Sequence, residues 1–198
     1  MRVVSSFLLL ILVGTTATSA PAPPQPKANY YPLKVGTKWT FKGEASGKAF
    51  EISNRVVEEE TINGVKMARI ETEIGGRTVT SEHVGVTDKG IFRYRYNGVK
   101  TDPPLCLLKF PVKESDRWQN EITSGTDTAK LTTEVGSAEV TVAAGTFKTV
   151  RVRMEGKVGT RDMSTTYWFA DGYGIVRQEA EFNGIKMSLE LEKLESAK

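Results

Sequence analysis

The chain is dominated by a period-two alternation of apolar and polar residues, which is broken at short intervals by pairs of turn-forming residues. Over residues 185–191 an apolar side chain occupies every second position, with lysine, serine and glutamate in between. Such alternation is typical of a strand with one face in a core and the other in water. No segment carries the 3.6-residue apolar stripe of an amphipathic helix. The chain is therefore predicted to be all-β.

Turn signals divide this pattern into hairpins. Asn-Gly pairs stand at 63–64, 97–98 and 183–184, each between β-prone segments. A two-residue type I′ turn requires positive φ at both central positions, and Asn and Gly tolerate it best. Gly-Gly at 75–76 and Ala-Gly at 144–145 are further candidate reversals. Consecutive strands are therefore predicted to be antiparallel neighbours.

The predicted strands are long and follow one another with short connections. They span residues 38–44, 48–59, 65–74, 77–87, 90–97, 104–111, 116–124, 127–136, 138–143, 147–158, 163–170, 174–182 and 185–194. Right-handed twist accumulates along such a series, which favours an antiparallel meander that forms a curved half-barrel or a closed barrel. A two-sheet β-sandwich is the alternative. An outer-membrane barrel has strands of similar length, but charged residues interrupt both faces of 65–74 and argue against it.

The amino terminus has the pattern of an export signal. A positively charged start is followed by a short apolar stretch and then by a run of small residues. The predicted layout is a signal peptide at 1–20, a proline-rich tether at 21–29 and a single β domain at 30–198. No later run approaches the ~20 apolar residues of a membrane-spanning helix. We therefore expect an exported protein, periplasmic or extracellular, with no integral membrane segment after signal removal.

Charge and cysteine content exclude several classes of partner and cross-link. The chain has 27 Lys and Arg against 24 Asp and Glu. The predicted signal peptide removes Arg2, so the mature chain is close to neutral. Total charge therefore gives no indication of a nucleic-acid or anionic-membrane partner, which requires a clustered basic face. The single cysteine, Cys106, cannot form an intramolecular disulfide.

No residue pattern indicates a catalytic or metal site. His83 is the only histidine, and its neighbours Ser81 and Glu82 cannot both share its face of a strand. One histidine also excludes the common histidine-rich zinc sites. Cys106 lies in an apolar, proline-bounded segment, where burial raises the pKa of a thiol and leaves it unreactive. We predict no catalytic residue, no metal ligand and no cofactor, and that the protein is not an enzyme.

One aromatic stripe is a candidate for binding. Phe92, Tyr94 and Tyr96 alternate with Arg93 and Arg95, so a regular strand would place the three rings on one face. If that face looks into the barrel, the rings could line a cavity for a ligand. The same stripe is typical of core packing with the hydroxyl groups at its rim. Both interpretations stay open.

Three segments together resemble a family of uncharacterised secreted bacterial β-proteins. They are YYPLKVGTKWTF at 30–41, VTVAAGTF at 140–147 and YWFADGYGIV at 167–176. The family is similar to half-barrel envelope proteins, among them the periplasmic lipoprotein carriers. The resemblance implies a curved sheet and offers no catalytic residues. The chain departs from the family pattern at Ala143 and Asp171, where proline is expected, which puts the rigidity of those turns in question.

Three functions of different classes follow from these observations. The first is a non-enzymatic envelope or secreted protein that binds a lipid or another apolar or amphipathic ligand on its curved sheet. The second is a structural or assembly protein that acts through contacts with other envelope proteins. The third is a hydrolase that uses two carboxylates.

Overall fold

The computed structural model describes residues 28–62 and 64–197. The predicted signal peptide, most of the predicted tether and Asn63 lie outside the described residues. The strands are β1 (Lys38–Ala45), β2 (Lys48–Ile62), β3 (Val65–Ile74), β4 (Arg77–Thr87), β5 (Gly90–Tyr96), β6 (Val99–Lys109), β7 (Arg117–Ser124), β8 (Asp127–Val142), β9 (Gly145–Val158), β10 (Arg161–Ala170), β11 (Gly174–Phe182) and β12 (Ile185–Glu195). Over this part of the chain, no helix is long and apolar enough to cross a bilayer.

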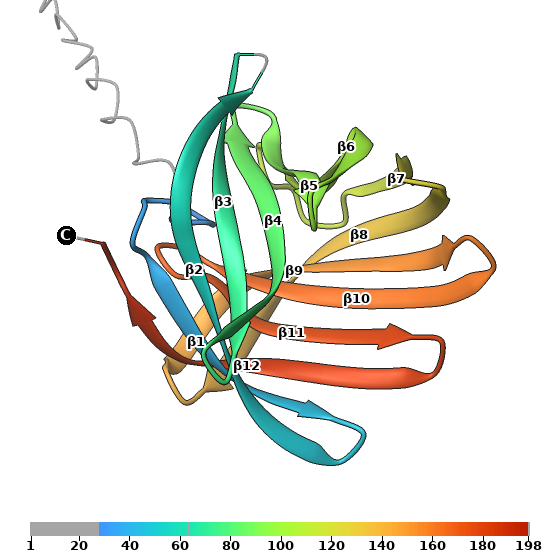
Figure 1. Ribbon diagram of the computed structural model, residues 1–198. Coiled ribbons are helices and arrows are strands. Elements are labelled where there is room, and N and C mark those ends of the chain that lie inside the picture. The colour runs from blue at the N-terminus through green and yellow to red at the C-terminus, as the bar shows by residue number, and fades with distance from the viewer. Residues whose placement is uncertain (1–27, 63, 198) are drawn as a thin grey trace, which may run out of the picture.

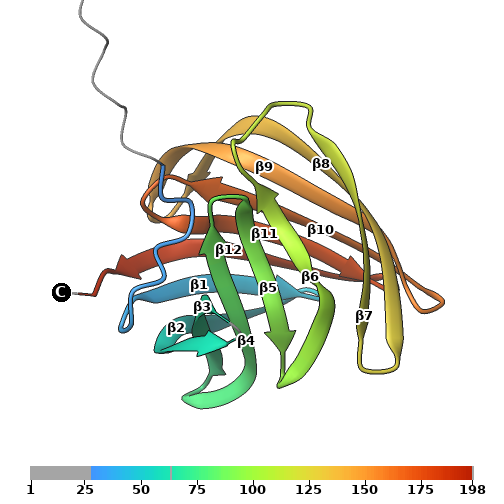
Figure 2. The ribbon, with the colours of Figure 1, turned by 90° about the horizontal axis from the view of Figure 1, so that it is seen from above.

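The strands form one closed antiparallel barrel. Each strand pairs with its neighbours in sequence, and β1 pairs with both β2 and β12 to complete the circuit. This confirms the predicted antiparallel meander and its closed-barrel option. Figure 1 shows β2, β3 and β4 running across the direction of β9 to β12, so the barrel has two crossing walls. The view from above in Figure 2 shows β5, β6 and β7 between these walls.

The turn chemistry produces hairpins where the sequence indicates them. Asn97 and Gly98 have φ of 48° and 78°, and Asn183 and Gly184 have φ of 51° and 82°. Both pairs therefore have the positive φ at two successive residues that a type I′ turn requires. Gly145, with φ of 139°, begins β9 directly after the reversal from β8.

The largest departures from the predicted strands are in β8 and β6. The predicted strands 127–136 and 138–143 form the single strand β8, because the residues around Gly136 pair with β9 without interruption. β6 begins at Val99 instead of at 104, and so runs through Pro103 and Pro104. Neither proline pairs with β5 or β7. Residues without an N–H are tolerated at such unpaired positions.

The seam between β6 and β7 is the weakest in the barrel wall. Only Thr101 and Asp102 pair with β7, and beyond them the strands diverge. The buried Asn120 side chain bridges the gap: its Oδ1 accepts from the Cys106 N–H, and its Nδ2 donates to the Cys106 carbonyl, both at 3.2 Å. Nδ2 also donates to the Thr133 hydroxyl at 3.1 Å. A side-chain amide thus replaces a missing rung of the backbone ladder.

The segment before β1 closes one end of the barrel. The Asn29 N–H donates to Asp171 Oδ1 at 2.6 Å, and the Gly172 N–H donates to the Asn29 carbonyl at 2.9 Å. Tyr31 is buried, with its ring 5.6 Å from that of Trp39. This attachment leaves the opposite end of the barrel, where β11 turns into β12, without a covering segment among the described residues.

Candidate functional site

A cavity of about 430 Å³ lies inside the barrel, between the wall of β2 to β5 and the wall of β10 to β12. It is lined by Phe50, Ile52, Asn54, Thr72, Ile74, Val79, Thr80, Glu82, Arg93, Tyr96, Met163, Ser164, Thr165, Tyr167, Gln178, Ala180, Glu181, Phe182, Met187 and Leu189. These side chains come from strands that are far apart in the sequence and are held by packing on both walls. The cavity is within the volume range of pockets for small molecules.

The polar part of this cavity is built around an ion pair. Arg93 Nε donates to Glu82 Oε2 at 2.6 Å, and the two side chains are only 20% and 17% exposed. The Tyr167 hydroxyl, from the opposite wall, also hydrogen-bonds to Arg93. Burial lowers the pKa of Arg93, but Glu82 and Tyr167 more than offset it, so the net pKa is raised. The arginine is therefore charged, with its charge compensated by Glu82.

Tyr31 lies close to this group from the closed end. Burial raises the pKa of Tyr31 well above its usual value, and the carboxylate of Glu82 raises it further. Tyr31 therefore stays a neutral phenol throughout the ordinary pH range. The floor of the cavity thus combines one compensated charge pair with the Tyr167 hydroxyl, and the neutral phenol of Tyr31 lies behind this group.

The remaining lining is mostly apolar. Ile52, Met187 and Leu189 come from the two strands that flank β1, and a polar pair, the Thr72 hydroxyl with Asn54 Oδ1 at 2.8 Å, interrupts them. The Phe50 ring lies across Gly43 of β1, where an added Cβ would stand 2.3 Å from Phe50 Cε2. A glycine at this position lets the ring lie flat against the wall. The cavity is therefore amphipathic, with a polar floor and apolar sides.

The three predicted site residues lie on two faces of β5. A β-bulge at Tyr94 shifts the register, so that Arg93 pairs with Val84 while Arg95 pairs with His83. Tyr96 consequently lines the cavity together with Arg93. Phe92 lies on the opposite face from Arg93. The centre of the Phe92 ring is 6.4 Å from the centre of the Tyr94 ring. The expectation that all three rings share one face is thus wrong, because the bulge inserts a residue between them.

The sequence analysis did not identify Arg93, Glu82 or Tyr167 as site residues. Regular alternation assigned Arg93 to the face away from Tyr96, and nothing in the sequence marks the bulge that reverses this. The sequence pattern does indicate an inward-facing Tyr167, because Tyr167 alternates with the buried Thr165 and Phe169 on one face of its strand. Its contact with Arg93 depends on barrel closure.

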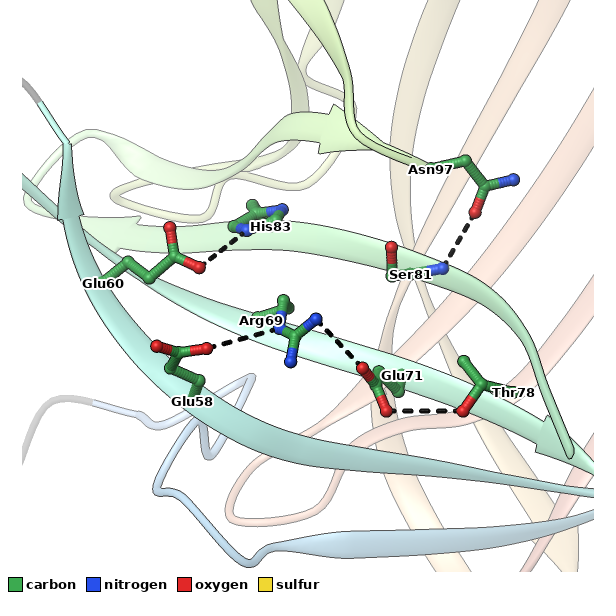
Figure 3. A network of polar contacts seen from close by, with 8 residues as sticks. All are labelled: Glu58, Glu60, Arg69, Glu71, Thr78, Ser81, His83 and Asn97. Atoms are coloured by element: carbon green, nitrogen blue, oxygen red, sulfur yellow. Dashed lines mark hydrogen bonds and ion pairs between the residues drawn. The ribbon is translucent and has the colours of Figure 1, made fainter. Parts of the chain in front are cut away.

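A second polar network lies on the face of β2, β3 and β4 that points away from the cavity (Figure 3). His83 is buried there, and its Nε2 lies 3.2 Å from Glu60 Oε1. Arg69 pairs with Glu58 at 3.5 Å and with Glu71 at 3.1 Å. Adjacent Glu82 faces the cavity, as strand alternation predicts. No serine or cysteine contacts His83 in this network, so it provides no nucleophile and base pair.

Cys106 is buried beside the β6–β7 seam. Burial raises the pKa of its thiol to about 11, although Lys109 lowers it slightly. The thiol is therefore protonated and unreactive at neutral pH. Within residues 28–62 and 64–197, no cluster of three His, Cys, Asp or Glu side chains could hold a metal ion.

Three other hollows are larger than the interior cavity. The smallest of the three, of about 530 Å³, lies beside Glu155, Gly156 and Asp162. Two are larger still. One, of about 680 Å³, includes Arg153, Arg177 and Glu179, which already form ion pairs on the strand surface. The other, of about 620 Å³, lies at the closed end and includes Tyr30 and Phe110. The interior cavity differs in that two opposing walls of the barrel contribute to its lining.

Comparisons with known proteins support the fold alone. No protein-family model matches the chain, and no curated protein sequence matches it. A crystal structure from Bacteroides fragilis, of a candidate exported protein with a YmcC-like fold, is 16% identical, covers 85% of this chain and 100% of its own, and has a TM-score of 0.54. A candidate lipoprotein from Parabacteroides distasonis is also 16% identical, with 86% and 100% coverage and a TM-score of 0.49. The Bacteroides fragilis structure supports the barrel-like fold that the resemblance implies. The family resemblance of the three quoted segments stays a prediction.

Proposed function

We propose that this protein is a non-enzymatic exported protein that binds a small amphipathic ligand inside its barrel. The observation that carries the proposal is the interior cavity of about 430 Å³, with a compensated ion pair at its floor and apolar side chains along its walls. Pockets of this size and composition are typical of small-molecule binding sites.

The charge state of the floor defines the kind of ligand head group. Arg93 is already neutralised by Glu82, so an anionic head would have to displace that carboxylate or pair against it. A neutral head with hydroxyl, ester or amide groups can instead exchange hydrogen bonds with Arg93, Tyr167 and the Thr72–Asn54 pair. A neutral lipid-like molecule with a single chain would match both the polar floor and the apolar walls of the cavity.

Two alternatives have less support. An assembly protein acting through strand edges needs an exposed unpaired edge. The barrel closes on itself through β1 and β12, and at the seam where β6 and β7 diverge the Asn120 side chain bonds to the Cys106 backbone. A carboxylate-dependent hydrolase needs a free acid and a free base. In the cavity, Glu82 is held by Arg93, and Glu181 stands 3.9 Å from Lys186.

Extraction of the bound ligand tests the proposal. The full chain would be expressed in its native host, the protein purified without detergent, and an organic extract analysed by mass spectrometry. We expect one class of neutral amphiphile in near-stoichiometric amount. The matched comparison is Ala180→Trp, which projects a ring into the cavity and should purify without that molecule.

An extract that holds no such compound, or one that is the same from the wild type and from Ala180→Trp, would contradict the proposal. Near-UV circular dichroism and thermal melting of the variant check that the barrel is intact, so that loss of ligand reports on the cavity.

A further inference from the structure

The apolar lining of the cavity is concentrated beside the hairpin turns at the open end of the barrel. Seven lining residues either directly precede one of these turns or follow it by three positions, and all seven are apolar or aromatic: Phe50, Ile74, Val79, Tyr96, Met163, Phe182 and Met187. We call these seven the apolar mouth. The turns all lead from an odd-numbered to an even-numbered strand, and a meander places such turns at one end of the barrel.

The apolar mouth borders both the cavity and solvent. Four of its members are between 38% and 48% exposed although they line the cavity: Ile74, Val79, Tyr96 and Phe182. The acid nearest to them in the lining, Glu181, stands 3.9 Å from Lys186. Clustered exposed apolar side chains of this kind mark a surface that a ligand or partner covers.

Polar lining residues lie further from the turns than the apolar mouth does. The order along three of the strands shows this: Thr72 precedes Ile74, Glu82 follows Val79, and Tyr167 follows Met163. The Arg93–Glu82 ion pair and the Tyr167 hydroxyl that bonds to Arg93 form the floor. The cavity is thus polar at its inner end and apolar at its opening. This is the reverse of a site that buries a hydrocarbon chain and leaves a head group in water.

The floor determines which end of a ligand enters first. An arginine carries five N–H donors in a planar fork, and hydrocarbon packed against it would exclude water without offering an acceptor. A head group with hydroxyl or ester oxygens replaces that water with hydrogen bonds to Arg93 and Tyr167. At the mouth the preference is the opposite, because a chain there removes apolar surface of both ligand and protein from water.

We propose that the ligand binds with its head group at the floor and its hydrocarbon chain in the apolar mouth, which selects ligands by chain length. This inference rests on the proposed function, because it requires that the cavity hold an amphiphile. The chemical class that fits is an uncharged single-chain amphiphile whose chain reaches from the floor to the hairpin turns. The end of that chain covers Ile74 and Val79 on one wall and Phe182 on the other.

Titration with 1-monoacylglycerols of octanoyl, decanoyl and dodecanoyl chain length tests the orientation, since the three probes share one uncharged head group. The protein purified from cells that express the full chain would be freed of co-purified lipid on a hydrophobic resin and titrated by calorimetry. We expect the affinity of the wild type to rise with chain length. Ile74→Ser with Phe182→Ser should weaken binding of the dodecanoyl probe by about tenfold or more and of the octanoyl probe by less than about twofold.

The floor variant should behave differently. Tyr167→Phe removes one hydroxyl from the head-group site, so it should weaken all three probes by a similar factor of about fivefold. The matched control is Val99→Ser with Ile185→Ser, which are the strand partners of Tyr96 and Phe182 and are exposed but outside the cavity lining. This pair should bind all three probes like the wild type. Thermal melting checks that each variant is folded.

Three results would overturn the orientation while leaving ligand binding intact. The mouth variant could bind every probe like the wild type, it could lose the same factor at every chain length, or the control pair could lose as much as the mouth variant does. A loss that grows with chain length in Tyr167→Phe would place the chain at the floor and also contradict the proposal. Absence of saturable binding of every probe by the wild type would instead contradict the proposed function itself.

Discussion

At the residue scale, one inserted residue in β5 decides which side chains face the cavity. The bulge at Tyr94 places Arg93 and Tyr96 on the same side, although a regular strand would separate them. Arg93 thereby reaches both Glu82 on the neighbouring strand and Tyr167 on the opposite wall. The polar floor of the site depends on this local irregularity, which the alternation of residue types does not reveal.

Loss of the acid in this pair should destabilise the barrel. Glu82→Gln leaves the Arg93 guanidinium uncompensated inside the cavity, and we expect the free energy of unfolding to fall by about 1–3 kcal/mol. Urea unfolding at neutral pH measures it. Glu121→Gln is the control, because Glu121 and Lys130 form a pair at 2.8 Å that is 65% and 72% exposed. That pair should contribute no more than about 0.5 kcal/mol. Equal effects of the two substitutions would contradict a buried role for Glu82.

Cys106 should make stability depend on pH in the alkaline range. Burial raises the pKa of its thiol from 9.0 to about 11, so the folded state holds this proton more tightly than the unfolded state. The corresponding stability is present below the unfolded pKa and is lost as the pH rises through 9 to 11. The fall in unfolding free energy over this range should therefore be smaller in Cys106→Ala than in the wild type. Parallel curves for the two proteins would show that the thiol is not buried in solution.

At the element scale, turn chemistry is the most reliable guide to the strands. The Asn-Gly pairs at 97–98 and 183–184 adopt the backbone that type I′ hairpins need. The glycine at 136 does not end its strand, because β8 and β9 continue to pair on both sides of it. Sequence analysis cannot distinguish such a glycine from a turn, since the difference lies in the neighbouring strand.

The β6–β7 seam depends on one side chain. Asn120→Leu keeps a similar volume but leaves the Cys106 N–H, the Cys106 carbonyl and the Thr133 hydroxyl without their partner. We expect a loss of about 2–3 kcal/mol in unfolding free energy. Hydrogen exchange of the Cys106 amide should also become faster. The adjacent exposed residue provides the control, as Gln119→Leu should change stability by no more than about 0.5 kcal/mol. If both variants exchange and unfold alike, the amide bridge is not what holds the seam.

At the scale of the whole molecule, closure of the barrel creates the site. Pairing of β1 with β12 brings the cavity-lining residues of β2 to β5 opposite those of β10 to β12. The sequence predicts the meander, but it leaves half-barrel and closed barrel open, since closure is a long-range pairing between strands at the two ends of the domain. Of the three predicted site residues, only Tyr96 lines the cavity, and none of the residues on the opposite wall was predicted.

Binding of an uncharged fluorescent amphiphile, N-phenyl-1-naphthylamine, measures most directly whether the barrel cavity accepts a ligand. The wild type should increase the fluorescence of the probe saturably. Ala180→Trp, which fills the cavity, should weaken binding by about tenfold or more, since the probe would lose a large part of its apolar contact. Glu179→Trp places the same side chain at the adjacent position, on the outer face of β11, and should bind like the wild type. Absence of saturable binding, or equal binding by the two tryptophan variants, would contradict a ligand site inside the barrel.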